Sequence, residues 1–546
     1  MTDTNSDTPR GINRRSLLAL LGVASIGGLL LPEQLRAQSV TSTGDAPKHG
    51  GTAVYSYGRN DPTMLSNIDR SGVEAITNKI FEGLVSFDFD FNPQPALAEK
   101  WTISDDGLTY TFHLVQNVKW HDGTPFTSAD VAYSLLTLKE LHPRRRATFA
   151  NFSSVETPDA NTVVIKLSDP APYLLGALEV GSAPIFAKHL YDGVDFATNP
   201  ANSRPIGTGP FRFVEWERGS HVLVERNPDY RDADKPYLDK IIFRILPEAG
   251  VRAAGLETGE IDVGNSSPVS SADIERLRAL PHLEFEERGY GRAAQQSQLF
   301  FNLDNPILKD RQVRLAIAHA IDPVAIRDIA WNGHARLSPA AIVPGGLYNN
   351  PDIKFYQFDR ELAGKLLDEA GYPEKDGGRF SIRILYAPWL DTLKRVADQV
   401  RGQLREVGID ANVESYDYAT FANKVYSERA FDIDVEALQN GYDPLDGVHR
   451  CYWTQAFKIG LQFSNPAHYS NPEVDKILEA AARENSFEKR KALYLKFQEI
   501  VHYDLPAINL VEAISYTVAN KRLKDHTINA VGAIYDFSDA WIDAPA

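Results

Sequence analysis

The chain has 546 residues, 43% of them hydrophobic, and a formal net charge of -16 at pH 7. This length is enough for several hydrophobic cores, and the acidic balance makes nucleic acid a poor partner. The single cysteine, Cys451, excludes an internal disulfide, a thiolate metal cluster and a CxxC redox pair. We expect Cys451 to be a small buried hydrophobic residue.

The N-terminal segment has the pattern of an export signal. The run from Asn13 to Leu18 resembles a twin-arginine motif, an apolar stretch continues to Leu31, and Leu35-Arg36-Ala37 fits a cleavage site. The apolar stretch is rich in glycine and too short for a membrane span, which needs about 20 residues. We therefore predict a twin-arginine-type signal peptide over 1–37 and a disordered lead-in over 38–47, with an uncleaved anchor and Sec export as alternatives.

The first predicted elements are a strand at residues 51–57 and a helix over 73–84. A β-hairpin comes next, because apolar residues alternate on both sides of Asp105-Asp106-Gly107, where glycine supplies the positive φ of the turn. A helix then begins at Thr127, and Asp130 follows at the spacing of a capping box.

The basic cluster Arg144-Arg145-Arg146 is predicted to be a solvated loop rather than an anion site. The chain then returns mostly to strands up to residue 303. We expect strands at 162–167, 209–214, 221–225, 240–245, 261–263 and 299–303, and a helix over 250–258 that Gly259 ends.

The clearest α/β unit lies further on. Apolar residues alternate over 379–386, form a helical stripe from 393 to 407, and alternate again over 409–413. This spacing predicts a βαβ crossover with two parallel strands. Ligands meet such sheets at the carboxyl ends of the strands, here the loop that carries Tyr386 and Trp389.

The rest of the second half is predicted to be mostly helical. Asp322-Pro323 ends or interrupts a helix with an apolar stripe at 313–321. Two helices are expected over 472–484 and 487–502, before a final strand at 514–518.

Motifs of common enzymes are missing from the sequence. It contains no HExxH, no GxSxG, no P-loop and no GxGxxG after a strand. The pair His121-Asp122 lies in a turn, which by itself explains the residues. We therefore expect no catalysis, no metal and no cofactor.

The stretch from Leu97 to Leu135 resembles the signature of extracellular solute-binding proteins of family 5, the dipeptide-, oligopeptide- and nickel-binding proteins of ABC importers. Further matches follow in the family's order along essentially the whole mature chain. They are IFEGLV, TGPFRFVEW, NPDYRD, FFNLDNPILKDRQVRLAIAHAID and YSNPEVDKIL.

The resemblance implies a class II periplasmic binding protein-like α/β fold of two lobes, with mixed sheets, flanking helices and crossing hinge strands. It assigns 48–80, 205–298 and 514–546 to lobe one, 81–204 to an inserted subdomain of lobe one, and 299–513 to lobe two.

The function that the resemblance implies is capture of a small polar, peptide-like solute between the lobes. The protein is then expected to be a periplasmic monomer, exported by the Tat route, that delivers its solute to an ABC permease and ATPase complex. The alternatives are a non-peptide solute (oligosaccharide, opine-like conjugate or metal chelate), a chaperone-like or sensory binder, and a secreted hydrolase.

The candidate site is the loop 439–444 and its continuation to Trp453, which concentrate amide, phenol, carboxylate, guanidinium and indole groups after a strand predicted at 431–435. In the peptide-binding branch the comparable loop supplies an aspartate to the peptide α-ammonium, and here that position is Asn440, which speaks against unmodified peptides. Asp443 is the candidate for a cationic group of the solute, and Arg450 for an anionic one. The predicted solute-binding residues are Tyr57, Tyr386, Trp389, Asn440, Tyr442, Asp443, Arg450 and Trp453.

Overall fold

The computed structural model describes residues 46–66, 72–142, 145–291, 294–375, 377–441 and 443–543. The predicted signal peptide and residues 38–45 of the predicted lead-in lie outside this part of the chain. Pro47–Ala546 form one compact unit, which holds both lobes. Within the described residues, no helix is both long and apolar enough to cross a membrane.

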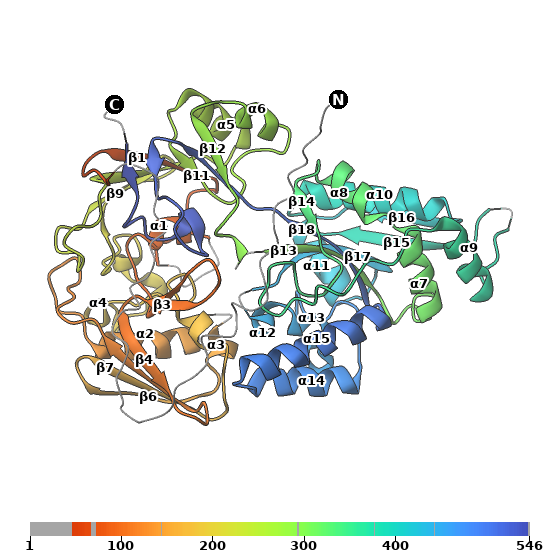
Figure 1. The fold of residues 1–546 in the computed structure, drawn as a ribbon, viewed down its shortest axis with the longest axis horizontal. Coiled ribbons are helices and arrows are strands. Elements are labelled where there is room, and N and C mark those ends of the chain that lie inside the picture. Colours follow the sequence, from red (N-terminus) through yellow and green to blue (C-terminus); the bar gives the residue numbers. More distant parts are fainter. Residues whose placement is uncertain are drawn as a thin grey trace, which may run out of the picture. The chain divides into compact units, whose positions relative to one another are not determined.

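Lobe one is built on a seven-stranded sheet with the order β12-β19-β11-β1-β10-β9-β8 (Figure 1). The central strand β1 runs parallel to both of its neighbours, β10 and β11. Its strands are β1 (Thr52–Tyr57), β8 (Phe211–Glu217), β9 (His221–Arg226), β10 (Lys240–Ile245), β11 (Val263–Gly264), β12 (Leu283–Glu286) and β19 (Thr517–Asn520). Helices α5 (Ala249–Thr258) and α6 (Ile274–Arg278) contribute to a core shared with β12 and β19.

The hairpin region forms a separate sheet that shares lobe one's main core. Its order is β4-β5-β7-β6, and the predicted hairpin is confirmed, with Gly107 at φ 71°. The capping box is confirmed too, because the Asp130 carboxylate accepts a 2.8 Å hydrogen bond from the Thr127 N–H. The elements are β4 (Ala98–Ile103), β5 (Thr109–Leu114), α2 (Ser128–Leu141), α3 (Arg145–Thr148), β6 (Phe152–Asp159) and β7 (Thr162–Leu167).

Lobe two is built on a six-stranded sheet with the order β14-β18-β13-β17-β15-β16. The predicted βαβ crossover is confirmed, because β15 and β16 pair in parallel and α10 connects them. The strands are β13 (Gln295–Phe301), β14 (Ala335–Leu337), β15 (Phe380–Tyr386), β16 (Ile409–Glu414), β17 (Ile433–Gln439) and β18 (Ala507–Ala513).

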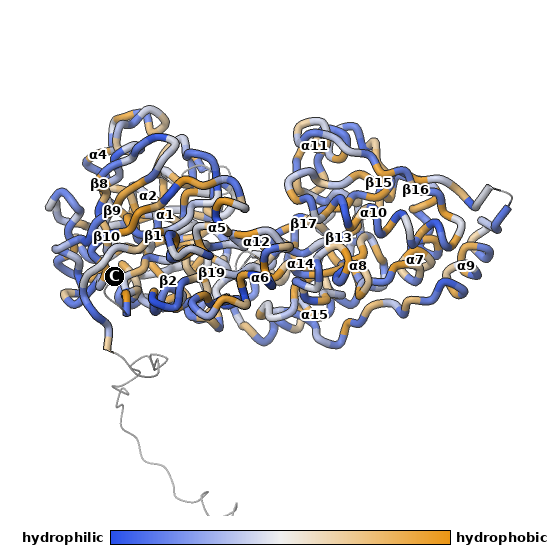
Figure 2. Tube along the Cα trace, turned by 90° about the horizontal axis from the view of Figure 1, so that it is seen from above, coloured by the Kyte–Doolittle hydropathy of each residue, from blue (hydrophilic) through white to orange (hydrophobic). Residues whose placement is uncertain are grey.

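Helices pack against this sheet around two cores. One core takes apolar residues from α7, α8, α9, α10 and α11, and the other from α13, α14 and α15. In Figure 2, α8 and α10 lie beside the strands of this sheet, and hydrophobic and hydrophilic residues alternate along the chain. The helices are α7 (Arg311–Ala320), α8 (Pro323–Ala330), α9 (Arg360–Glu369), α10 (Asp391–Arg405), α11 (Tyr418–Tyr426), α12 (Pro444–Gly447), α13 (His449–Tyr452), α14 (Pro472–Arg483) and α15 (Phe487–Asp504).

Several predicted elements have other bounds in the structure, among them the strands expected at 261–263 and 431–435, which are β11 and β17. The helix expected over 73–84 is only α1 (Glu74–Thr77), and the strand expected at 299–303 is β13, which begins at Gln295. The strand expected at 514–518 overlaps only the start of β19, because β18 ends at Ala513 and β19 begins at Thr517, in two different sheets. Burial explains this error, because Ala507–Glu512 are buried without the alternation that marks a strand with one solvated face.

Two segments connect the sheets of the lobes. Residues 287–291 and Ala294 lie between β12 and β13, and residues 514–516 lead from β18 back to β19. The crossing segments therefore bring together the ends of strands from both lobes.

Candidate functional site

Two cavities lie beside the crossing segments. The smaller chamber has a volume of about 390 Å³ and the larger chamber about 680 Å³. Both are lined by lobe one and lobe two, and they share a wall formed by Gly289, Tyr290, Gly441, Ala513, Ile514, Ser515 and Ala530. Volumes of this size are typical of small-molecule sites, which span about 300–1,000 Å³.

The larger chamber is lined by both polar and apolar residues and draws on three parts of the fold. Lobe one supplies Ser266, Ser267 and Tyr516, the hairpin region supplies His142 and Arg145, and lobe two supplies Leu390, Gln439 and Asp446, among others. Arg145 and Asp446 approach to 4.0 Å across this chamber. Opposite charges therefore face each other from the hairpin region and lobe two.

Arg145 corrects the expectation of a solvated basic loop. The residue is only 4% exposed, and its Nη2 donates to the Ser182 hydroxyl at 3.2 Å. The following residues Phe149 and Phe152 stack at 4.7 Å in the core and anchor this segment. Those aromatic residues were the signal in the sequence that Arg145 belongs to a packed element.

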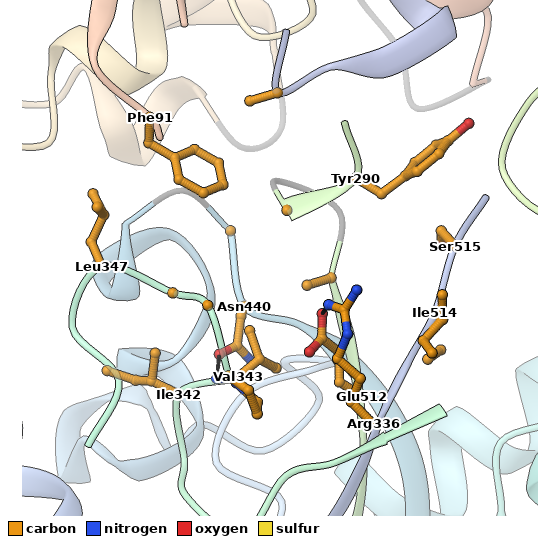
Figure 3. Close-up of a pocket in the computed structure, with 18 of the residues that line it drawn as sticks. Phe91, Tyr290, Arg336, Ile342, Val343, Leu347, Asn440, Glu512, Ile514 and Ser515 are labelled. Atoms are coloured by element: carbon orange, nitrogen blue, oxygen red, sulfur yellow. Dashed lines mark hydrogen bonds and ion pairs between the residues drawn. The ribbon is translucent and has the colours of Figure 1, made fainter. Parts of the chain in front are cut away.

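The smaller chamber is mainly apolar, and two of its charged lining residues, Arg336 and Glu512, pair with each other. Figure 3 shows Arg336 and Glu512 together, with Phe91 and Tyr290 on the opposite side. Arg336 Nη1 lies 3.4 Å from Glu512 Oε1. Glu512 is 6% exposed, and burial raises the pKa of its carboxyl group, which the Arg336 charge counteracts.

Of the predicted solute-binding residues that the structure describes, Asn440 is the one that lines a chamber. Its Oδ1 accepts a 2.8 Å hydrogen bond from the Val343 N–H, and its own N–H donates to the Ala294 carbonyl at 3.1 Å (Figure 3). Gly447 permits this packing, since a Cβ there would lie 2.3 Å from the Asn440 carbonyl oxygen. Asn440 thus ties the loop after β17 to lobe two's 342–348 segment and to the crossing segment.

Asp443 is engaged within lobe two. Its carboxylate accepts from Arg490 Nη2 at 2.9 Å and from Nη1 at 2.5 Å, and it also caps α12 by accepting from the Leu445 N–H. The side chain of Arg490 is 2% exposed. A buried guanidinium with this bidentate geometry compensates the Asp443 charge without a solute.

The predicted aromatic residues pack inside their own lobes. Tyr57 is buried and donates to the Gly72 carbonyl at 3.4 Å, and the Tyr386 hydroxyl donates to Ser415 Oγ at 2.6 Å. Trp389 contacts Tyr418, Phe421 and Phe463, all in lobe two. None of the three lines either chamber.

Arg450 and Trp453 also lie outside the lining of the two chambers. Arg450 Nε donates to the Gly447 carbonyl at 3.0 Å, and Trp453 Nε1 reaches Glu479 Oε1 at 3.4 Å. Tyr442 lies outside the described residues. Solute contacts of these side chains stay a prediction.

The other candidates for chemistry have structural roles. His121 is held between Gly209 O, 3.0 Å from Nε2, and the Gly207 N–H, which donates to Nδ1 at 3.2 Å. Burial lowers the pKa of His121 to about 4, so the ring is neutral at pH 7 and joins the turn to the 207–209 segment by hydrogen bonds. Cys451 is buried, as predicted. Across the described ranges, no group of three or more His, Cys, Asp or Glu residues could hold a metal ion.

Comparison with known proteins identifies relatives of this chain by sequence and by fold. The family described as bacterial extracellular solute-binding proteins, family 5 Middle, matches residues 92–456. A Brucella ovis protein, provisionally named as an ABC transporter peptide-binding protein, is 33% identical over 461 residues, which cover 82% of this chain and 84% of that protein.

Two solved structures show the fold. The periplasmic binding protein DppA of Helicobacter pylori, in complex with the peptide STSA, has a TM-score of 0.73 at 26% identity and covers 91% of this chain and 99% of its own. NikA of Brucella suis, in complex with Fe(III)-EDTA, has a TM-score of 0.79 at 25% identity. The match covers 90% of this chain and 100% of the NikA chain. The predicted two-lobed α/β fold is therefore confirmed, and the chain belongs to the bacterial extracellular solute-binding proteins of family 5.

Proposed function

We propose that this protein is the solute-binding component of an ABC importer, and that it captures a small polar, peptide-like solute between its lobes for delivery to a permease. The observation that carries the proposal is the larger chamber, about 680 Å³, whose wall is shared by lobe one, the hairpin region and lobe two. The Brucella ovis relative and the peptide complex of DppA support the peptide-like class.

Binding favours closure because a solute in this chamber touches both lobes at once. A ligand shifts a two-state equilibrium only by its differential affinity for the two states, and contact with both lobes supplies that difference. Direct polar contacts between the lobes, among the described residues, include the Asn332 amide, which donates to Ser271 Oγ at 2.8 Å, and His334, which lies 3.8 Å from Glu275. Arg145 and Asp446 add a 4.0 Å approach from the hairpin region to lobe two. Capture then needs no covalent step.

The solute contacts proposed for the larger chamber are charged and polar side chains. Arg145 faces an anionic group, Asp446 a cationic one, and Gln439 a neutral polar group. From the loop after β17, we propose Asn440, at the wall of the smaller chamber, and Tyr442 as further contacts. For Asp443 to bind a cationic group directly, its pair with Arg490 has to open, so we assign it to holding this loop.

Small-angle scattering combined with native mass spectrometry tests the function. Protein purified from its host is expected to carry a small solute, and the solute-bound form to have a smaller radius of gyration than the stripped form. Identical scattering with and without bound solute would contradict closure. A solute recovered in chemically altered form would instead indicate the hydrolase alternative, and its identity separates peptides from sugars, conjugates and chelates.

We propose a periplasmic location and export by the Tat route, from the sequence Asn13 to Ala37. N-terminal sequencing of the exported form is expected to begin near Gln38. Replacing Arg14 and Arg15 by Lys is expected to block export, whereas normal export of that variant would point to Sec. Sedimentation of the exported form checks the proposed monomer.

A further inference from the structure

The smaller chamber contains an arginine whose charge is only partly compensated. Arg336 contacts Glu512 once, at 3.4 Å, and the structure gives its guanidinium no other polar partner within the described residues. A guanidinium has five N–H donors, so most of them are open to the chamber. The Arg336 side chain is 48% exposed, whereas that of Glu512 is 7% exposed.

The position of this pair is fixed by the sheet. Arg336 in β14 lies directly opposite Glu512 in β18, so both side chains stand on one face of the sheet. Gln296 in β13 lies opposite Glu512 on the other side and is held by Ser338 and Ala340. Glu512 therefore acts as the anchor that orients Arg336, and Figure 3 shows the guanidinium directed toward the space below Phe91 and Tyr290.

The accessible charge in the chamber is positive. Oε2 of Glu512 is shielded from solvent and has no hydrogen-bond partner among the described residues. Burial raises the pKa of Glu512, and the charge of Arg336 counteracts this shift. The other charged lining residues are paired elsewhere: Arg288 with Glu286 at 2.6 Å, and Glu287 with Arg278 at 3.7 Å.

Apolar side chains make up a large part of the remaining lining. Phe91, Ile342, Val343, Leu347 and Ile514 surround the space in front of Arg336. An apolar cavity with one oriented polar group selects a ligand that has an apolar body and a single matching charge. A guanidinium matches the two oxygens of a carboxylate with parallel N–H donors.

We infer that the smaller chamber is a binding subsite for a carboxylate attached to an apolar body, with Arg336 as the residue that contacts the carboxylate and Glu512 as the residue that positions Arg336. The wall shared by the two chambers allows the carboxylate to belong either to the captured solute or to a separate small acid. The assignment of this subsite to recognition of the captured solute rests on the proposed function. The binding of a carboxylate by Arg336 does not depend on the proposed function.

The test uses three probes of the same shape: hexanoate, hexanamide and hexylamine, titrated into the stripped full-length mature protein by calorimetry or ligand-observed NMR. Wild-type protein is expected to bind hexanoate saturably and the neutral and cationic probes much more weakly. Arg336→Gln is expected to weaken hexanoate binding by about tenfold or more, since bonds to charged groups are worth more than neutral ones. The matched control is Arg288→Gln, because Arg288 lines the same chamber but is paired with Glu286. This variant is expected to bind hexanoate as tightly as wild type.

The inference is overturned if wild-type protein shows no saturable hexanoate binding, if it prefers hexylamine, or if Arg336→Gln binds hexanoate as well as wild type. The amount of host-derived solute that co-purifies with each variant then identifies the source of the carboxylate. Loss of that solute from Arg336→Gln places the carboxylate on the solute, and its retention indicates a separate small acid. Scattering that shows no closure would count against the proposed function alone.

Discussion

Asp443 and Arg490 form a bidentate ion pair between the loop after β17 and helix α15, with Nη–Oδ distances of 2.9 and 2.5 Å. Tyr348 and Tyr494 surround the guanidinium, each with its ring centroid within 5.4 Å of it. The hydroxyls of both tyrosines accept from the same guanidinium. The pair therefore fixes the loop that carries Asn440 and Gly441 to the lining of both chambers.

Asp443→Ala is expected to lower the stability of lobe two. Breaking a buried ion pair leaves an uncompensated charge, which costs about 3–5 kcal/mol, and this variant also removes the cap of α12. Denaturant unfolding and the melting temperature measure the effect, and Asp443→Asn separates the charge from the cap. Unchanged stability with solute affinity reduced about tenfold would instead assign Asp443 to direct solute binding.

The free energy of unfolding is expected to fall as the pH rises through the neutral range. Glu436 and Asp434 are fully buried on β17; burial raises the pKa of Glu436 to about 7 and raises that of Asp434. The folded state therefore binds protons more tightly than the unfolded state. The stabilisation by the protonated carboxyl groups is complete below about pH 4 and is lost as the pH rises through about 7.

Glu436→Gln tests this dependence because the amide oxygen can still accept from the Tyr426 hydroxyl, now 2.7 Å from Glu436 Oε2. The variant is expected to show a smaller loss of stability than wild type between pH 5 and pH 8 in urea unfolding. Glu287→Gln, on an exposed residue, is the control and should follow wild type. A Glu436→Gln profile as steep as that of wild type would contradict the assignment.

Arg145→Gln is expected to weaken binding of the solute that co-purifies with the protein by about tenfold or more, because removing one partner of a desolvated charge pair costs about 2–5 kcal/mol. Its neighbour Arg146 is exposed and donates to the Glu140 carbonyl at 2.8 Å, so Arg146→Gln is the matched control. Calorimetry measures both, with the melting temperature as a check on folding. Equal affinities would remove Arg145 from the proposed site.

Free dipeptides are expected to bind wild-type protein weakly or not at all, whereas Asn440→Asp is expected to create measurable binding. The aspartate can still accept from the Val343 N–H and adds a negative charge at the wall of the smaller chamber. Asn440→Ala lacks both features and serves as the control. Tight dipeptide binding by wild type would show that position 440 does not decide peptide recognition.

Local patterns in the sequence determined much of the fold. The hairpin around Gly107, the capping box of Thr127 and Asp130, and the βαβ unit all depend on neighbours within a few residues or on one helical or strand period. Such signals need no knowledge of distant partners, because the hydrogen bonds and the apolar face are contained in the segment itself. The loop at 439–444 was recognisable for the same reason, as a polar run after a strand.

Only the tertiary structure decided what these polar residues face. Asp443 looks available in the sequence, yet Arg490, 47 residues away, compensates its charge. Arg336 and Glu512 are separated by 176 residues and meet because β14 and β18 are neighbours in one sheet. Arg145 looks like part of a solvated cluster until the packing of Phe149 and Phe152 buries it. Burial and charge compensation depend on long-range packing, so composition could indicate a polar loop after a strand but not which of its side chains remain open to a solute.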